Sequence, residues 1–194
     1  MEDKRINLFK QELSFIGNER IRKFTIEALK ALPEYFFTIP ASSSGKYHPD
    51  YALGSGGLVR HVKAAVAIAH VLMGNETIGG KFAPESKDMV ISALILHDGC
   101  KNGVPDTKHT VTDHPLVVCT VVEEAVKGNE DITSPAVRNE IYTLIRTHMG
   151  QWNTDRNNNV ILPKPERGLQ SFVHMCDYLA SRKMIDFNFD VNVG

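Results

Sequence analysis

The chain has 194 residues, of which 42% are hydrophobic and 23% are charged, and its formal net charge is -1. These fractions are ordinary for a globular protein, and the length suits one domain with a sizeable core. The near-neutral charge excludes a global basic field that would attract nucleic acid.

The cysteines and the N-terminus indicate where the protein works. Cys100, Cys119 and Cys176 form neither an even set nor a paired pattern, so we expect no disulfide framework and a reducing compartment. The N-terminal segment is charged and amphipathic and lacks the apolar stretch of a signal peptide. No apolar run approaches the roughly 20 residues that a membrane-spanning helix needs. The sequence therefore predicts a cytoplasmic protein with no membrane partner.

Helical spacing of apolar residues marks the N-terminal part of the chain. Residues 3–15 follow this spacing, and a second helix is expected between Asn18, a good N-cap, and Pro33, which a helix interior does not tolerate. We expect these helices to form an extension over residues 1–37 that packs on the main domain.

The main domain is expected over residues 38–194 and begins with a loop rich in Ser, Gly and Pro over residues 38–56. One later segment, KDMVISALILH, is apolar nearly all round and predicts a central buried helix. Strands are not required, although short ones are possible within 99–113 or 185–193. The fold class is therefore all-α, a single helical bundle. Its helices are expected over about residues 57–72, 86–97, 115–127, 135–148 and 166–184.

Several polar side chains lie on helix faces that are otherwise apolar. His148 and Asp177 share their faces with aliphatic residues, and His97 and Asp98 end the most apolar helix. Burying one unpaired carboxylate costs several kcal/mol or more unless it is protonated, paired or bound to a metal. A divalent cation held by neutral imidazoles and carboxylates resolves this conflict.

Each of these residues also has an ordinary explanation. A single His on an apolar face is usually a core residue, and a single buried Asp is usually a cap or a hydrogen-bonded group. The convergence of several on one interior is harder to explain in this way, but residue types alone leave both a metal site and ordinary core packing open. At a helix end, His97 and Asp98 can both reach an ion, and the two oxygens of Asp98 can bridge two ions.

The chain resembles the HD superfamily of metal-dependent phosphohydrolases. The resemblance is carried by GGLVRHVKAAVAIAH, ALILHDGCKNG, DHPLVV, LIRTHMGQW and FVHMCDYLASR, which together span roughly residues 54–184. The family pattern H…HD…D falls on His61, His97-Asp98 and Asp177. His114 and His148 match the extra histidines of the branch that holds two metals.

This resemblance implies a ligand set and a reaction. His61, His97, Asp98 and Asp177 would hold one ion, while Asp98, His114 and His148 would hold a second. The expected cofactors are one or two divalent transition-metal ions: manganese, iron, nickel, cobalt or zinc. A water activated between them would attack phosphorus, so no side-chain nucleophile is required.

The resemblance also points to residues that meet the substrate. Many relatives read HDIGK where this chain reads HDGCK, so Gly99 and Cys100 differ while Lys101 keeps its place. In relatives this lysine contacts substrate phosphate, which makes Asp98 and Lys101 the expected catalytic pair. Further candidates for substrate binding, each of which could instead be a solvated or packing residue, are His48, Lys46, Arg60, His109, Trp152 and Arg182.

We therefore predict a phosphohydrolase or phosphodiesterase acting on a nucleotide or a related small phosphorylated molecule. One alternative is a 3′–5′ exonuclease-like enzyme on short RNA or DNA, although the chain carries no OB-type domain such as those enzymes have. Another is a metal-containing nucleotide-binding module without turnover. We expect no stable nucleic-acid complex, and a homo-oligomer is possible.

Overall fold

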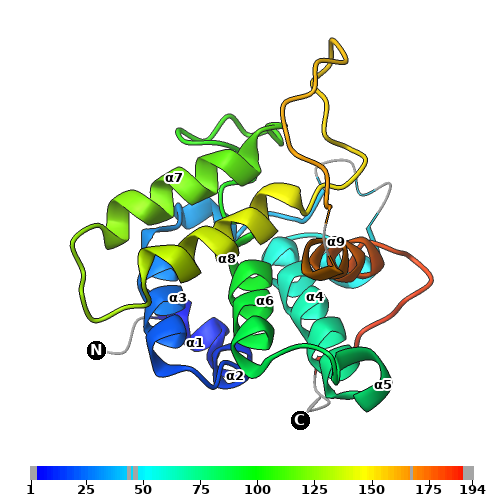
Figure 1. Ribbon diagram of the computed structural model, residues 1–194. Helices are drawn as coiled ribbons and strands as arrows, with labels where there is room; N and C mark the ends of the chain where they lie inside the picture. Colours follow the sequence, from blue (N-terminus) through cyan, green and yellow to red (C-terminus); the bar gives the residue numbers. More distant parts are fainter. Residues whose placement is uncertain (1–3, 43–44, 46–47, 167, 190–194) are drawn as a thin grey trace.

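The computed structural model describes residues 4–42, 45, 48–166 and 168–189. Within these residues the protein is built from helices and contains no strand, which confirms the all-α prediction (Figure 1). The α-helices are α1 (Lys4–Leu8), α2 (Lys10–Ser14), α3 (Glu19–Ala31), α4 (Gly57–Gly74), α5 (Glu76–Gly79), α6 (Pro84–Leu96), α7 (His114–Val126), α8 (Pro135–Thr147) and α9 (Gly168–Ala180). Two short 3₁₀ helices, η1 (Glu34–Phe37) and η2 (Asp50–Ala52), lie between α3 and α4.

Helix α6 is the centre of the bundle, as its apolar sequence predicts. It packs against α3, α4, α8 and α9 (Figure 1). Its residues from Val90 to Leu96 are all buried. A helix enclosed on every side can hold polar groups only where they have partners. The polar residues that follow its last turn therefore enter the interior of the bundle.

Capping residues fix several helix ends, among them the predicted N-cap Asn18. The side chain of Asn18 accepts hydrogen bonds from the backbone N–H groups of Arg20 and Ile21 at the start of α3. Ser134 accepts one from Val137 at the start of α8. Gly128 follows α7 with a φ of 78°, a left-handed conformation that glycine adopts without strain.

The first predicted helix is broken in the structure. Residues 3–15 were expected to be continuous, but α1 ends at Leu8, and the N–H of Phe9 bonds to the carbonyl of Ile6 three residues back. The break lets the fully buried Phe9 ring stack on Phe36, with 6.0 Å between ring centroids. Tertiary packing thus overrides local helical periodicity here.

At the other end of the chain, α9 stops at Ala180, whereas the sequence predicts a helix to about residue 184.

Helix α4 is long and apolar enough to cross a membrane by length and composition alone. Within the protein 56% of that stretch is buried, and the helix packs against α6 and α9. A core helix of a soluble protein passes the same test, so this feature is weak evidence for a span.

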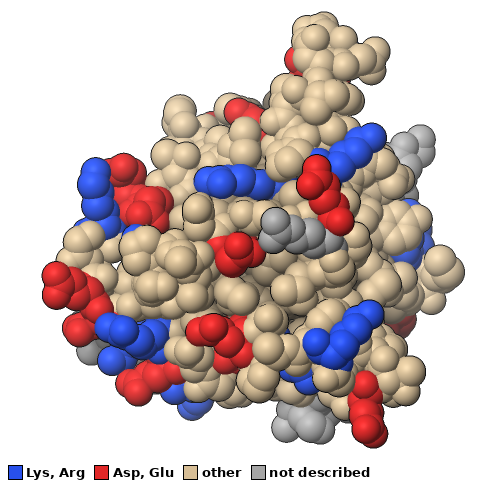
Figure 2. Space-filling model, viewed as in Figure 1, with Lys and Arg blue, Asp and Glu red and all other residues tan. Residues whose placement is uncertain are grey.

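On the face drawn in Figure 2, acidic and basic side chains are interspersed.

The N-terminal helices share the hydrophobic core with the rest of the chain. Helix α3 packs against α6 and α7, and the hydroxyls of Thr25 on α3 and Ser92 on α6 lie 2.7 Å apart in the buried interface. The division at residues 37 and 38 stays a prediction.

Asp88 ties the turn before α3 to α6. Its largely buried carboxylate accepts hydrogen bonds from the backbone N–H groups of Gly17, at 2.9 Å, and Asn18, at 2.8 Å. We expect Asp88→Ala to lower the free energy of unfolding by about 2 to 4 kcal/mol, because two hydrogen bonds to a charged acceptor are lost. Urea unfolding monitored by circular dichroism measures this change.

A matched control for Asp88 is Asp155, whose carboxylate also accepts backbone N–H groups but in an exposed loop. Asp155→Ala should leave the unfolding midpoint nearly unchanged. Equal effects of the two substitutions would contradict the role assigned to Asp88.

Candidate metal centre

Five helices deliver polar side chains to one interior point of the bundle. His61 lies on α4, His97 and Asp98 follow the last turn of α6, and His114 begins α7. His148 is the C-cap of α8, and Asp177 lies on α9. The first five residues are each at most 2% exposed, while the Asp177 side chain is 19% exposed. The structure thus brings all six predicted ligands together.

The Asp98 carboxylate divides the histidines into two pairs. Its Oδ2 atom faces Nε2 of His61, at 3.8 Å, and Nε2 of His97, at 3.7 Å. Its Oδ1 atom faces Nε2 of His114, at 3.0 Å, and Nε2 of His148, at 3.8 Å. One carboxylate therefore presents a separate oxygen to each pair.

Asp177 completes the first half of the cluster. Its Oδ1 atom lies 2.9 Å from Nε2 of His61 and 3.4 Å from Nε2 of His97. In the second half, the Nε2 atoms of His114 and His148 are 3.4 Å apart. Two sets of three residues have ligand atoms close enough to share an ion: His61, His97 and Asp177, and His97, Asp98 and His148.

These separations fit a transition-metal ion. Bonds of about 2.1 Å to nitrogen and oxygen place neighbouring ligand atoms roughly 3.0 to 3.4 Å apart. The separations within each half run from 2.9 to 3.8 Å, so small adjustments of the side chains would complete either shell. Mixed imidazole and carboxylate donors suit zinc, manganese, iron, cobalt and nickel.

The orientation of three histidines is fixed by the same kind of hydrogen bond to the backbone. In each, Nδ1 lies within hydrogen-bond distance of the carbonyl of the residue three positions earlier, so it donates to that carbonyl and the lone pair stays on Nε2. The pairs are His97 with Leu94, at 2.7 Å, His114 with Val111, at 2.8 Å, and His148 with Ile145, at 2.7 Å.

This tautomer creates a conflict that a cation resolves. Nε2 of His97 is buried, has no hydrogen-bond partner, and faces carboxylate oxygens of Asp98 and Asp177. A nitrogen lone pair facing carboxylate oxygens is repulsive unless a proton or a metal ion lies between them. The buried donor set therefore fits a resident divalent cation.

The electrostatics keep the carboxylates ionised. Burial alone would raise the pKa of Asp98, but the Lys101 ammonium opposes this as the largest lowering influence, and the pKa lies well below its usual value. The pKa of Asp177 is likewise well below its usual value, and the hydrogen bond with His61 is the largest influence that opposes burial. Burial, reinforced by His97, lowers the pKa of His148 to about 3, which keeps that imidazole neutral.

Lys101 stands at the edge of this cluster. Its ammonium nitrogen lies 2.5 Å from Oδ2 of Asp98, and its side chain is 13% exposed. Together with Lys108 it lines a small cavity of about 90 Å³. Lys101 thus lies between the interior Asp98 carboxylate and a cavity that two lysine side chains line.

His48, from the loop before α4, covers one side of the cluster. Its ring lies 5.2 Å from that of His61 in an edge-on arrangement, and its buried Nδ1 has no hydrogen-bond partner. Burial and the neighbouring His61 lower its pKa to about 3. Lys46, predicted in the same loop, lies outside the described residues.

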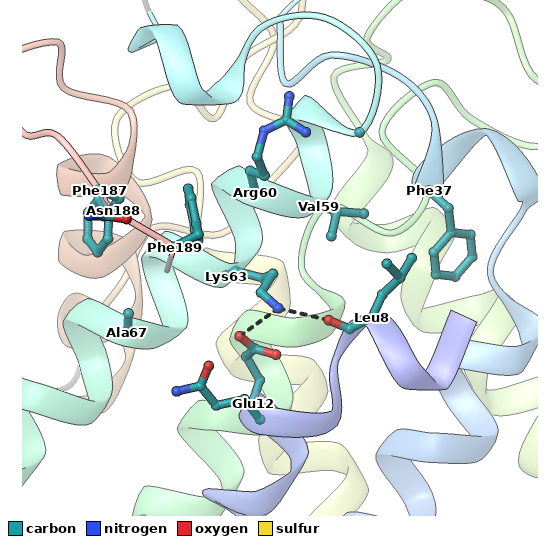
Figure 3. A pocket seen from close by; sticks show the side chains of 12 residues that line it. Leu8, Glu12, Phe37, Val59, Arg60, Lys63, Ala67, Phe187, Asn188 and Phe189 are labelled. Atoms are coloured by element: carbon teal, nitrogen blue, oxygen red, sulfur yellow. Dashed lines mark hydrogen bonds and ion pairs between the residues drawn. The ribbon is translucent and has the colours of Figure 1, made fainter. Parts of the chain in front are cut away.

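Arg60 and His109 line two other hollows of the protein, and their roles in substrate binding stay predictions. The Arg60 guanidinium binds the backbone carbonyls of Tyr51 and Leu53 and lines a separate cavity of about 290 Å³ between α2, α4 and the C-terminal segment (Figure 3). These contacts favour a structural role for Arg60. The exposed His109 lines a shallow groove with Arg156, and the structure records no contact between His109 and the metal ligands.

Trp152 and Arg182 belong to an aromatic stack beside the cluster. The Trp152 ring stacks on Tyr178, with 5.9 Å between centroids and 18° between planes. The Arg182 guanidinium lies 4.2 Å from the Tyr178 ring centroid on α9. Neither Tyr178 nor His174 is among the residues predicted for the site. The adjacency of Tyr178 to Asp177, and of His174 one helical turn before it, is the signal that could have indicated both.

No family model, curated protein or solved structure matches the chain.

Proposed function

We propose that the protein is a metal-dependent hydrolase of phosphate esters. The observation that supports this most strongly is Asp98, whose two oxygens each face a pair of histidines. A cluster needed only to hold helices together would not require a carboxylate placed between two sets of neutral donors. Such an arrangement is suited to two ions that share one bridging ligand.

Each residue has a defined task in this proposal. Divalent ions bound to the six ligands would polarise phosphoryl oxygens and activate a water at neutral pH. The backbone carbonyls of Leu94, Val111 and Ile145 keep three imidazoles in the tautomer that binds metal. Lys101 supplies positive charge where a phosphate approaches from the open side.

Elemental mass spectrometry and a hydrolysis assay test the proposal together. We expect protein purified without chelator to carry about two transition-metal equivalents and to cleave p-nitrophenyl phosphate or bis(p-nitrophenyl) phosphate. Removing the metal should abolish turnover, and adding manganese or zinc should restore it. A fully chelated protein that still turns over would rule out the proposed chemistry.

Lys101→Met should separate metal binding from catalysis. The ligand set remains complete, so we expect unchanged metal content but a turnover number lower by roughly 10²-fold, since one charged contact to the phosphate is lost. Lys108→Met is the matched control, because Lys108 lines the same cavity but is exposed and makes no ion pair with Asp98. Equal loss in both variants would contradict the role proposed for Lys101.

A second candidate is a metal-containing binding module without turnover. The observation that favours it is the burial of the ligands, since among the six only the Asp177 side chain is more than 3% exposed. Two bound ions combined with no hydrolysis of any phosphate ester would support this reading over the enzyme.

A further inference from the structure

We propose that the cavity between α2, α4 and the C-terminal segment binds a small neutral aromatic alcohol. This α2–α4 cavity has a volume of about 290 Å³. Arg60, which lines it, precedes the metal ligand His61, but neighbours on a helix point about 100° apart. The cavity therefore lies on a different side of α4 from the metal centre, and a ligand bound there does not depend on metal.

A buried carboxylate lies in the wall of the α2–α4 cavity. Glu12 of α2 is only 4% exposed, and its Oε1 atom lies 3.2 Å from the ammonium nitrogen of Lys63 on α4 (Figure 3). Among the described residues, its buried Oε2 atom has no hydrogen-bond partner. A buried carboxylate oxygen without a donor is unfavourable. The wall thus holds a strong acceptor that an O–H or N–H group of a ligand would satisfy.

The charges around this carboxylate disfavour an ionic ligand. Arg60 and Lys63 bring two positive charges to the cavity against the single negative charge of Glu12, so a cationic ligand would be repelled. An anionic ligand would place its own oxygens against the Oε2 atom of Glu12 and would supply no hydrogen to it. A neutral hydroxyl avoids both conflicts, since it can donate to Oε2 and still accept a hydrogen bond.

Lys63 can donate the hydrogen bond that the hydroxyl oxygen of the ligand accepts. Its ammonium nitrogen lies 2.8 Å from the backbone carbonyl oxygen of Leu8, in addition to its contact with Glu12. An ammonium group carries three N–H bonds, so with respect to the described residues these two contacts leave one for a ligand. Glu12 and Lys63 together therefore offer an acceptor and a donor to the same hydroxyl.

The walls beyond these charged groups are apolar and largely aromatic. Phe187 and Phe189 of the C-terminal segment lie on one side of Glu12 in Figure 3. Phe37 and Val59 lie on the other side. Aromatic walls favour a flat aromatic ligand, because rings pack edge-on or offset against one another. An engineered apolar cavity of about 150 Å³ holds benzene, so a cavity of about 290 Å³ suits two fused rings.

Tyr51 joins the aromatic wall to the rest of the cavity. Its ring meets those of Phe187 and Phe189 edge-on, at 5.5 and 5.6 Å between centroids. Its backbone carbonyl accepts a hydrogen bond from the Arg60 guanidinium, and its hydroxyl donates one to the carbonyl of Ala180 on α9. The C-terminal segment is therefore anchored beside the cavity by contacts of its own.

Four naphthalenes that differ in one substituent test the proposal. They are 2-naphthol, 2-methoxynaphthalene, which has no hydrogen to donate, 2-naphthoate and the (2-naphthyl)methylammonium ion. Titrations of the purified protein, followed by the fluorescence of each naphthalene, give the affinities. We expect 2-naphthol to bind about 10-fold more tightly than each of the others, because only 2-naphthol donates to Oε2 of Glu12 without bringing a net charge.

Glu12→Gln tests the carboxylate itself. The amide keeps the shape of the side chain but removes its negative charge and half of its acceptor capacity. The preference for 2-naphthol over 2-methoxynaphthalene should fall below about 3-fold. Because Arg60 and Lys63 are then unbalanced, 2-naphthoate should bind roughly 10-fold more tightly than it does to the wild type.

Ala67→Leu tests the cavity independently of the charges. Ala67 lines the cavity from α4 and is 8% exposed, so a leucine would fill part of the space. Both 2-naphthol and 2-methoxynaphthalene should then bind roughly 10-fold more weakly. The matched control is Val71→Leu on the same helix, a 57% exposed position that does not line the cavity. It should leave every affinity unchanged, and circular dichroism should show all three variants folded.

Four results would overturn the inference. They are equal affinities for 2-naphthol and 2-methoxynaphthalene, tighter binding of either ion to the wild type, affinities that Ala67→Leu leaves unchanged, and no binding of any of the four naphthalenes. Metal content and phosphate-ester hydrolysis are measured separately on the same preparations. A protein that holds two ions and cleaves phosphate esters without binding 2-naphthol would overturn this site alone. A protein that binds 2-naphthol as expected but holds no metal would support this site and remove the proposed function.

Discussion

Asp98→Ala should empty both halves of the metal centre and lower phosphate-ester hydrolysis by roughly 10³-fold. Asp98 is the only ligand of the six with one oxygen directed at His61 and His97 and the other at His114 and His148. Its loss leaves only two neutral imidazoles in the second half and only His61, His97 and Asp177 in the first. Fewer ligands and one carboxylate fewer weaken the binding of a divalent cation in both halves. Metal content should fall from about two equivalents to nearly none.

Variants that remove a ligand from only one half of the centre test this prediction further. Asp177→Ala removes a ligand that contacts only His61 and His97, so about one ion should remain at His114 and His148. His114→Ala should leave about one ion in the other half. His109→Ala is the matched control, because this exposed histidine lies in a loop and should not change the metal content.

The stoichiometries distinguish the possible outcomes. Two ions in the wild type, one in each single-half variant and none in Asp98→Ala would support the divided centre. One ion in the wild type that survives His114→Ala would instead indicate a mononuclear site, and it would remove the roles proposed for His114 and His148.

Much of the site could be predicted because burial and polarity conflict within the sequence itself. His148 and Asp177 lie on faces that must pack inward, and His97-Asp98 follows a helix with no polar face. Such residues must meet partners in the core. The bonds from Nδ1 to the carbonyl three residues earlier could not be foreseen, because they depend on how each helix ends.

The residues around the ligands are harder to predict, because adjacency to a ligand in the sequence does not decide what a side chain contacts. Arg60 precedes His61, but neighbours on a helix point about 100° apart, and Arg60 lines a different cavity (Figure 3). Tyr178 also neighbours a ligand, yet it stacks on Trp152 from another segment. The sequence does not show how α9 packs against the loop after α8, and this packing decides whether a residue next to a ligand in the sequence also lies beside it in space. The break at Phe9 has the same origin, since it depends on where the ring is buried.

Phe24→Ala should lower the free energy of unfolding by about 3 to 5 kcal/mol, the usual cost of removing a fully buried phenylalanine. Phe24 lies on α3 with none of its surface exposed, and its ring meets Tyr142 of α8 edge-on, at 6.1 Å between centroids. Helix α8 also carries His148 at its C-cap. The cavity would therefore weaken the contact between the N-terminal helices and an element that holds a metal ligand.

This substitution tests whether residues 1–37 can be separated from the metal-binding part. Thermal unfolding followed by circular dichroism, with and without added zinc, should show one cooperative transition that Phe24→Ala shifts to lower temperature in both conditions. Leu8→Ala on α1, where the side chain is 44% exposed, is the control and should shift it little. An unchanged main transition in Phe24→Ala would mean that α3 does not stabilise the helices that carry the metal ligands. Residues 1–37 would then be an appendage whose loss the metal centre tolerates.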